Sequence, residues 1–296
     1  MSFTARAVRA SLVALSAVAP PVAAEIGFRL WRRLGRPESV HARDLAVHAR
    51  ATRGTLELDG IPVATYAWGD GPEVVLLVHG WRSRASRFAP LVEALESTSR
   101  TIVAFDAPGN GDSTGDFTTF LDYAEIIRLL SARHDGFSAI VAHSFGVLST
   151  FVAVREGAAT DRIVGISGMY NADQLVDAFA QLSGLPPRAK RRFRSLIERR
   201  TFPGIPDVWR RAVAELDPTD TKTPVLLIHD RDDTRVDVGQ AELIAEAHTG
   251  PVGVVLTEGL GHNRILSDEA VLDEIARFLN APQEAAVDAV RAARAG

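Results

Sequence analysis

The chain has 296 residues, of which 46% are hydrophobic and 24% are charged. This is the composition of a folded, water-soluble protein and excludes a disordered, collagen-like or multi-span membrane chain. The 33 basic and 37 acidic side chains give a formal charge of -4, so the sequence predicts no nucleic-acid partner, and the absence of cysteine excludes disulfides, thiolate metal sites and a cysteine nucleophile.

Residues 1–50 are predicted to form an N-terminal helical segment. Within it, two arginines precede an apolar run that ends near residue 24, which is the pattern of a secretory signal peptide. The stretch 25–34 then continues at helical spacing with further arginines, which favours a retained helix that packs on the protein or lies on a membrane surface. We therefore predict a cytoplasmic protein, in which residues 26–36 or the basic insertion described below are the candidate sites of a peripheral membrane contact. A cleaved signal, and hence secretion or a periplasmic location, is the alternative.

Residues 51–168 are predicted as the first part of an α/β core. Alternating residues at 55–58 and 63–68 flank Asp59-Gly60, which is typical of two antiparallel edge strands. Buried parallel strands are predicted at 74–78, 101–105, 139–142, 163–166, 225–228 and 252–256. Helices are predicted at 90–95, 120–130, 147–155, 240–247 and 270–279. This alternation predicts a doubly wound, mostly parallel sheet with helices on both faces.

The alternation is interrupted over residues 169–222, where three helices are predicted instead, at 172–182, 187–198 and 206–216. An insertion between strands on the ligand-binding side of such a sheet is typical of a lid. The core resumes over 223–280, and residues 281–296 are predicted to form a tail helix that packs loosely.

The predicted lid is strongly basic. Between residues 186 and 211 nine basic side chains face two acidic ones, a local charge of +7. A charge run of this kind is most often a solvated helix face. The alternative is that this basic lid contacts an anionic lipid surface or attracts an acidic substrate.

Ser144 lies at the end of a predicted buried strand and directly before a helix. A serine at such a turn can be held with its hydroxyl exposed if the flanking residues are small enough for strand and helix to meet. Ala142 and Gly146 meet this requirement, although the usual pattern, Gly-x-Ser-x-Gly, has glycine at the first position. A helix N-cap is the alternative role for this serine.

Acyl transfer by a serine requires a base, a carboxylate that orients the base, and two amide donors for the oxyanion. Candidates follow in the order serine, aspartate, histidine. Asp233 comes after the strand at 225–228, with Asp232 and then Asp230 as the alternative carboxylates, and His262 follows the strand at 252–256. The backbone N–H groups of Trp81 and Phe145 are the candidate oxyanion donors.

Taken together, these segments resemble the α/β-hydrolase superfamily over residues 51–280. The segments that carry the resemblance are Val78-His-Gly-Trp81, Phe105-Asp-Ala-Pro-Gly-Asn-Gly-Asp-Ser113, Ala142-His-Ser-Phe-Gly146, His229-Asp-Arg-Asp-Asp233 and Gly261-His262-Asn263. The resemblance implies that Ser144 is the nucleophile, His262 the general acid and base, and Asp233 the orienting carboxylate. It also implies a serine esterase or lipase with a small-molecule ester-like substrate. The chain departs from the family pattern at Ala142 and at Asp230, where the similar loop usually has glycine.

Several activities share these residues and stay open at this point. Similar chains include thioesterases, cofactor-free haloperoxidases and carbon–carbon bond hydrolases, as well as low-turnover ligand-binding relatives. Epoxide and dehalogenase chemistry is disfavoured because similar enzymes have aspartate where this chain has Ser144. The sequence predicts no cofactor and no metal, since no dinucleotide, phosphate-loop or zinc-protease pattern is complete. Trp81 and the lid suggest a pocket for a modest apolar group.

Overall fold

A computed structural model of the chain describes residues 3–33, 35–96, 100–219 and 222–295. The chain divides into two compact units, each built from two separate stretches of sequence. The helical unit comprises residues 1–35 and 171–212, and the core unit comprises residues 36–170 and 213–296. In the part of the chain that is described, no helix is long and apolar enough to cross a bilayer.

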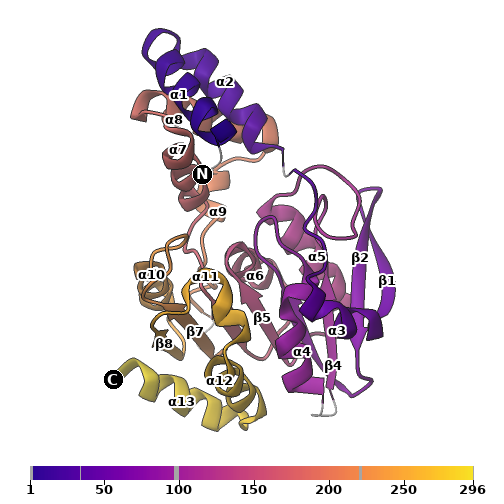
Figure 1. Cartoon of the computed structure of the whole chain (residues 1–296). Helices are drawn as coiled ribbons and strands as arrows, with labels where there is room; N and C mark the ends of the chain where they lie inside the picture. Colours follow the sequence, from indigo (N-terminus) through magenta and orange to yellow (C-terminus); the bar gives the residue numbers. More distant parts are fainter. Residues whose placement is uncertain (1–2, 34, 97–99, 220–221, 296) are drawn as a thin grey trace. The chain divides into compact units, whose positions relative to one another are not determined.

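The core unit is built on an eight-stranded sheet with the strand order β1-β2-β4-β3-β5-β6-β7-β8 (Figure 1). The strands are β1 (Thr52–Leu58), β2 (Ile61–Trp68), β3 (Glu73–Val78), β4 (Arg100–Phe105), β5 (Ala139–His143), β6 (Ile163–Ile166), β7 (Val225–Asp230) and β8 (Val252–Thr257). β2 pairs antiparallel with β1 and β4, and all other pairings are parallel. The predicted α/β class with a mostly parallel sheet is confirmed.

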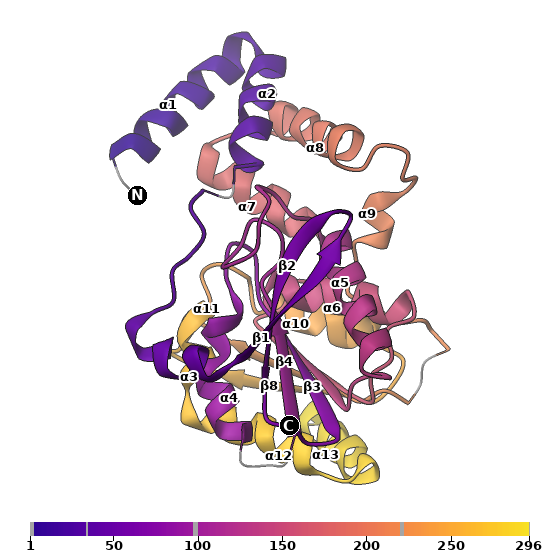
Figure 2. The ribbon, with the colours of Figure 1, turned by 90° about the vertical axis from the view of Figure 1, so that its right-hand side faces the viewer.

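Helices cover both faces of this sheet. α5 (Phe120–Arg133) packs on α6 (Phe145–Arg155), whereas α4 (Ala89–Glu96) packs on α3 (Leu45–Arg50) and α12 (Glu269–Asn280). In Figure 2 these two groups lie on opposite sides of β3 and β4. Because helices cover both faces, the central strands β5, β6 and β7 are buried along their whole length. The remaining helices of this unit are α10 (Gly239–Ala247), α11 (Gly261–Arg264) and α13 (Gln283–Ala295), with three short 3₁₀ turns at Ala42–Asp44, Ala85–Phe88 and Ile265–Ser267.

The tail helix α13 packs more closely than we predicted. It lies along β8, with Ala286 and Val290 fully buried. Its backbone can approach because β8 has Gly253 at the contact, where an added Cβ would lie only 2.7 Å from the Cα of Val290. A small residue in the strand thus converts a chain-terminal helix into part of the core.

The helical unit contains α1 (Phe3–Val18), α2 (Pro20–Trp31), α7 (Asp173–Ser183), α8 (Pro187–Thr201) and α9 (Val208–Arg211). α2 packs on both α1 and α8 (Figure 2). Gly27 permits the approach, because an added Cβ would lie 3.2 Å from the side chain of Leu185. The Trp31 ring meets Phe193 edge-on at 6.1 Å. The predicted N-terminal helix and the predicted insertion are therefore packed together in one unit, and the role of the insertion as a lid stays a prediction.

The predicted helix over 206–216 is wrong in extent, since α9 covers only four residues. The chain leaves helical geometry because its backbone groups bond elsewhere: the N–H of Ala214 donates to the carbonyl of Tyr170, and the N–H of Ala172 donates to the carbonyl of Ala212. Asp207 has a φ of 51°, which is not helical, so the helix begins only at Val208.

The two units differ sharply in charge. The helical unit carries 14 basic and 5 acidic side chains, a formal charge of +9, and the core unit carries the remaining 19 basic and 32 acidic side chains, a formal charge of -13. All eight histidines also lie in the core unit. The overall charge of -4 thus conceals two strongly charged parts of opposite sign.

Candidate active site

Ser144 occupies a strained turn between β5 and α6. Its φ of 56° and ψ of -120° lie in a region that residues with side chains rarely adopt. The turn is tight enough to require glycine at position 146, where an added Cβ would lie 2.5 Å from the carbonyl oxygen of Val78 and 2.7 Å from that of His79. Ala142 is completely buried and pairs with Val78 and Gly165 on the neighbouring strands, so alanine is accommodated there.

The structure brings Ser144, His262 and Asp233 together in one hydrogen-bonded chain. His262 Nδ1 lies 2.7 Å from Asp233 Oδ2, and His262 Nε2 lies 3.1 Å from Ser144 Oγ. An ionised carboxylate only accepts hydrogen bonds, so Nδ1 carries the proton and Nε2 is left to accept the hydroxyl proton of Ser144. The three residues follow β5, β7 and β8 at the edge of the sheet where parallel strands end.

Asp233 is held by several groups besides His262. Its Oδ1 accepts from the backbone N–H groups of Arg235 and Val236, at 2.8 and 3.0 Å. The buried His229 donates from Nε2 to the carbonyl of Val236 and lies 3.5 Å from Asp233 Oδ2. Burial alone would raise the pKa of Asp233, but the hydrogen bonds from His229, His262 and the backbone outweigh it and hold the pKa well below its usual range.

Asp233 thus forms the hydrogen bond to His262, and the alternative carboxylate Asp232 has a different partner. Asp232 is exposed and accepts from the N–H of Gly259 at 2.9 Å.

Asp230 has a different role, which the sequence analysis missed. It is fully buried and accepts four hydrogen bonds, from the hydroxyl of Thr257 and from the N–H groups of Asp232, Leu260 and Gly261. Burial alone would raise the pKa of Asp230, but these donors more than offset it and the pKa is lowered. The carboxylate therefore fixes the turn that leads into His262. The departure from glycine at this position was the signal that marked it.

His143 and His79 hold the loops around Ser144 through hydrogen bonds to backbone groups. His143 Nε2 donates to the backbone carbonyl of His262 at 2.9 Å, and burial, reinforced by the neighbouring His262, lowers the pKa of His143 to about 3. His79 Nε2 accepts from the N–H of Ala107 at 3.0 Å. Its other nitrogen therefore carries the proton and donates to the carbonyl of Gly80 at 2.8 Å.

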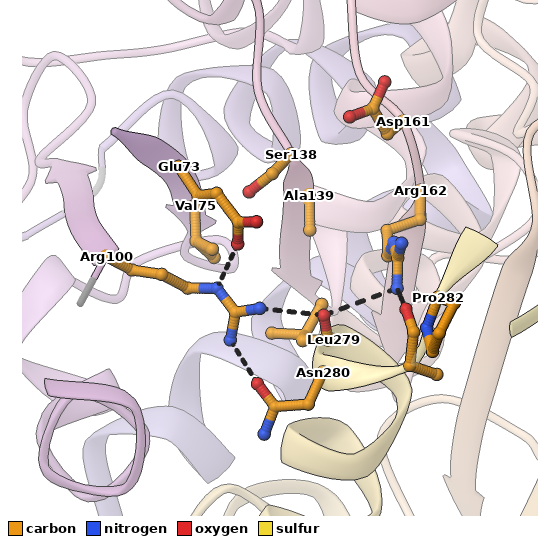
Figure 3. Close-up of a pocket in the computed structure, with 11 residues that line it drawn as sticks. Glu73, Val75, Arg100, Ser138, Ala139, Asp161, Arg162, Leu279, Asn280 and Pro282 are labelled. Carbon is orange, nitrogen blue, oxygen red and sulfur yellow. Dashed lines mark hydrogen bonds and ion pairs between the residues drawn. The ribbon is translucent and has the colours of Figure 1, made fainter. Parts of the chain in front are cut away.

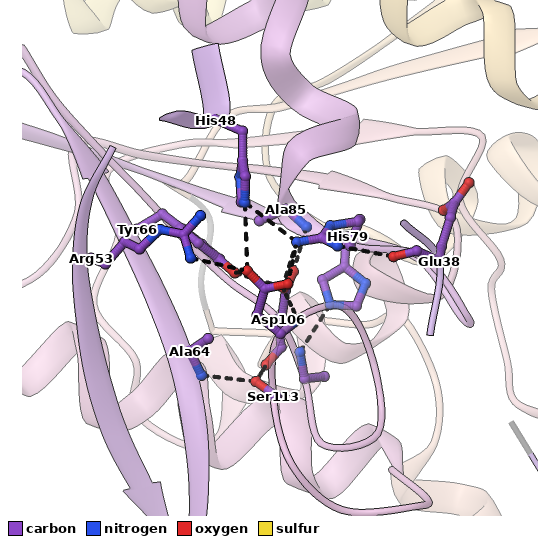
Figure 4. Close-up of polar contacts among 12 residues, drawn as sticks. Glu38, His48, Arg53, Ala64, Tyr66, His79, Ala85, Asp106 and Ser113 are labelled. Atoms are coloured by element: carbon purple, nitrogen blue, oxygen red, sulfur yellow. Dashed lines mark hydrogen bonds and ion pairs between the residues drawn. The ribbon is translucent and has the colours of Figure 1, made fainter. Parts of the chain in front are cut away.

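A buried polar network joins the loops that follow β3 and β4 (Figure 4). At its centre Asp106 accepts from the N–H of Ala85 at 2.7 Å, the N–H of Asp112 at 2.8 Å and the hydroxyl of Tyr66 at 2.8 Å. Arg84, which is only 3% exposed, bridges Asp106 and Asp112. This network was not predicted from the sequence, because its partners are dispersed along the chain.

Trp81 and Phe145, the predicted oxyanion residues, lie beside Ser144 in the chain or in space. Phe145 is the first residue of α6, and Trp81 follows Gly80, whose added Cβ would lie 3.0 Å from the Cβ of Ser144. The two rings meet edge-on at 5.1 Å. Both residues are thus positioned near the serine by the same close approach of two strand ends.

A pocket of about 390 Å³ opens on these residues within the core unit. It is lined by Glu38, Gly80, Trp81, Arg82, Ser83, Arg87, His143, Ser144, Arg235, His262 and Asn263. Trp81 is the one large apolar side chain in this lining. The expectation of an apolar pocket does not fit this lining, because four of its side chains are charged.

A second hollow of about 280 Å³ lies at the opposite edge of the sheet, where the parallel strands begin (Figure 3). Its two arginines are engaged by the protein itself. Arg100 donates to Glu73, Asn280 and the carbonyl of Leu279, and Arg162 donates to carbonyls at the end of α12. These arginines stabilise the carboxyl end of a helix, so this hollow has the features of a structural joint. Among the described residues, no cluster of acidic and histidine side chains could hold a metal ion.

Comparison with known proteins identifies the family of this fold. The family model described as "Alpha/beta hydrolase family" matches residues 75–277. No curated protein matches the sequence.

Solved structures with the same fold catalyse more than one reaction. Mouse alpha/beta hydrolase domain-containing protein 10 is 21% identical, with a TM-score of 0.58 over 78% of this chain and 97% of its own. An esterase from Pyrococcus furiosus is 18% identical (TM-score 0.57, covering 83% and 98%), and an epoxide hydrolase from Vigna radiata is 17% identical (TM-score 0.55, covering 78% and 98%). The family match spans most of the sheet and the strand ends that bear Ser144, Asp233 and His262, and the chain belongs to the α/β-hydrolase family.

Proposed function

We propose that this protein is a serine hydrolase that cleaves a carboxylic ester-like bond through a Ser144–His262–Asp233 triad and an acyl-enzyme. The observation that carries the proposal is the continuous hydrogen-bonded chain from the Ser144 hydroxyl through His262 to a buried carboxylate. The strained backbone of Ser144 supports it, since strain of this kind collects at reactive residues.

In the proposed reaction Ser144 Oγ attacks the acyl carbon while His262 Nε2 takes the hydroxyl proton. His262 then gives this proton to the leaving alcohol as the ester C–O bond breaks, which leaves an acyl group on Ser144. A water molecule attacks the acyl carbon with His262 again as base, and the carboxylic acid is released as Ser144 recovers its proton. Asp233 keeps its charge throughout and stabilises the imidazolium.

The developing oxyanion is assigned to the backbone N–H groups of Phe145 and Trp81. The first N–H groups of a helix have no partner four residues earlier within that helix, and Phe145 begins α6. The positive end of the helix macrodipole lies at the same place. Loss of one such donor typically lowers kcat by about 10²–10³-fold.

Four alternatives use the same residues. Thioesters, carbon–carbon bonds and cofactor-free haloperoxidation would each use Ser144 and His262, and a ligand-binding relative would keep the pocket with little turnover. The epoxide hydrolase among the structural neighbours shows only a shared fold, and serine rather than aspartate at position 144 favours ester cleavage. A panel of esters and thioesters separates ester from thioester hydrolysis, whereas the carbon–carbon and haloperoxidase alternatives each need an assay of their own reaction.

The proposal is tested without knowledge of the substrate. The purified chain is treated with a fluorophosphonate probe, and the adduct is located by mass spectrometry. We expect a single adduct on Ser144, no adduct in Ser144→Ala, and labelling slowed by about 10³-fold or more in His262→Ala. His134→Ala is the matched control, because His134 lies at the end of α5 and does not line the pocket. An intact chain that gives no Ser144 adduct would disprove the triad and favour the ligand-binding alternative.

A further inference from the structure

The pocket at Ser144 has a charge opposite to that of the unit that forms it. Its lining includes Arg82, Arg87 and Arg235 but a single acidic residue, Glu38. With neutral histidines this gives the lining a formal charge of +2, whereas the core unit as a whole carries -13. A local reversal of sign of this size favours an anionic ligand.

Two of the arginines are available to such a ligand. Arg87 and Glu38 share a partner inside the protein, since each lies within hydrogen-bonding distance of His41. Arg82 and Arg235, in contrast, are exposed, and neither forms an ion pair with any residue that the structure describes. Their guanidinium groups can pair with a carboxylate or phosphate through two parallel hydrogen bonds.

Both arginines are fixed to the reactive residues through the backbone. Arg235 donates its N–H to Asp233 Oδ1, the carboxylate that also holds His262. Arg82 follows Trp81 directly and has φ of 55°, a left-handed conformation that is unfavourable for any residue with a Cβ atom. A strained position occupied by arginine rather than glycine or asparagine indicates a use for the side chain.

We propose that the substrate is an anionic ester, with a carboxylate or phosphate placed a few bonds from the scissile bond, and that Arg82 and Arg235 bind this group. The inference rests on the proposed hydrolase function and names the substrate class of the same site. The small pocket volume of about 390 Å³ is consistent with a compact substrate.

The test uses esters that differ in charge but hardly in shape. Hydrolysis of 4-acetoxybenzoate is compared with that of neutral 4-acetoxybenzamide, each rate being divided by its rate with hydroxide, and 4-acetoxyphenyl phosphate distinguishes phosphate from carboxylate. We expect kcat/KM to favour an anionic ester by about tenfold at low salt and less at high salt. Arg82→Gln and Arg235→Gln should each reduce this preference by about three- to fivefold, because kcat/KM for the anionic ester should fall more than kcat/KM for the neutral ester. Arg133→Gln, on the last turn of α5 and outside the pocket, should change neither rate.

A binding measurement keeps the two proposals distinguishable. In Ser144→Ala, calorimetry compares the Kd values of the charged and neutral esters without turnover. Equal Kd values, or turnover that does not distinguish the esters, would overturn the substrate class and leave the hydrolase proposal intact. Two results together would support the anion site and contradict the hydrolase proposal. They are tighter binding of the anionic ester and a failure of Ser144 in the unmodified chain to react with the fluorophosphonate probe.

A second inference rests on the helical unit alone. Eight large apolar side chains are notably exposed among the described residues, and six of them belong to this unit: Val8, Val13, Val18, Val22, Ile26 and Leu182. The same unit carries the formal charge of +9. Exposed apolar side chains next to clustered arginines are the features of a helix pair that lies on an anionic membrane surface.

The arginines at the start of α8 are the best candidates on this surface for contact with an anionic headgroup. Arg188, Arg191 and Arg192 are exposed and, among the described residues, form no ion pair. They follow closely in sequence on Leu182, which is 65% exposed at the end of α7. We propose that the helical unit docks the protein on anionic lipid headgroups through this region.

Sedimentation with vesicles tests the docking surface. The full chain should bind vesicles containing about one third phosphatidylglycerol, bind pure phosphatidylcholine at least tenfold more weakly, and dissociate as salt is raised. The triple variant Arg188→Gln, Arg191→Gln, Arg192→Gln should lose most of this binding. The matched control changes three exposed arginines of the core unit, Arg128, Arg231 and Arg277, to glutamine and should retain it. Equal binding to both vesicles, or binding of duplex DNA in place of vesicles at the same salt, would overturn the proposal.

Discussion

The core unit and the helical unit differ in how their charged side chains are placed. In the core unit, the carboxylates of Asp230 and Asp233 near Ser144 are buried and accept hydrogen bonds from backbone N–H groups, and Asp233 also accepts one from His262. In the helical unit, ion pairs such as Lys190–Asp177 lie on the surface and many arginines face solvent. Buried pairs determine geometry, whereas exposed charges act at a distance and are screened by salt. We therefore expect substitutions to be costly in the first unit and mild in the second.

The largest expected contrast concerns two glycines. Gly146→Ala places a Cβ against two backbone oxygens that cannot rotate away, so we expect the free energy of unfolding to fall by about 3 kcal/mol or more. Gly204→Ala in the helical unit meets no atom within 4 Å and pays only for its φ of 77°, about 1 kcal/mol. Urea unfolding of both variants measures the difference. Equal losses would contradict the contrast between the units.

Asp230 provides the next test. Asp230→Asn retains one acceptor oxygen and turns an NH₂ group toward backbone donors, so we expect a loss of about 2–3 kcal/mol in unfolding free energy together with slower labelling of Ser144. Asp232→Asn is the matched control, because this exposed carboxylate accepts a backbone hydrogen bond from Gly259 at the surface. Its loss should lower the free energy of unfolding by less than about 1 kcal/mol, as is usual for a surface interaction. A neutral Asp230→Asn would show that the loop holds His262 without it.

The pH dependence of stability should also separate the units. The folded pKa of His143 is about 3, against about 6.5 when unfolded, so below pH 6.5 the unfolded chain takes up a proton that the folded chain does not. Stability therefore falls as pH drops through this window, by about 2 kcal/mol between pH 7.5 and 5 from His143 alone. Burial also lowers the pKa values of His48 and His79, which act in the same direction.

The helical unit has no histidine and should lack this dependence. Hydrogen exchange followed by peptide mass spectrometry at the two pH values, corrected for intrinsic rates, compares the units. Removal of the titrating group in His143→Gln should flatten the slope of the core unit. An unchanged slope would assign the effect to other groups.

The smallest expected effect lies in the helical unit. Arg194→Ala removes an ion pair with Asp173 and a guanidinium that stacks 4.1 Å from the ring centre of Trp209, and we expect a loss of about 1 kcal/mol. Arg191→Ala, three residues earlier on α8, should be close to neutral because Arg191 is exposed and has no ion-pair partner among the described residues. A loss above about 2 kcal/mol for Arg194→Ala would mean that this surface is less exposed to water than the exposure of its side chains indicates.

Sequence patterns predicted the sheet well because burial and tight turns constrain residues that are adjacent in the chain. Continuous apolar runs such as Val225–Ile228 require burial on both faces, and the small residues around Ser144 require a tight turn. The packing of α2 against α8 could not be predicted in this way, since it joins residues such as Glu25 and Arg200 that lie far apart in the chain. The Asp106 network and the four partners of Asp230 were missed for the same reason. The sequence around a carboxylate at or just after the end of a strand does not show whether that carboxylate is solvated or buried.

The interleaving of the two units affects how the chain can be processed and synthesised. The N-terminal half of the helical unit leaves the ribosome before any strand of the sheet, and its partners in α7 and α8 follow only after β6. Until then α2 has no α8 to cover it, and Phe193 and Ile197, fully buried in the finished protein, in turn depend on that pairing. Cleavage after residue 24 would remove α1 and the first turn of α2, so a processed chain would have to cover the exposed side of α8 in another way. N-terminal sequencing of the native protein therefore reports on the packing of α8, which begins at Pro187, far along the chain from the cleavage point.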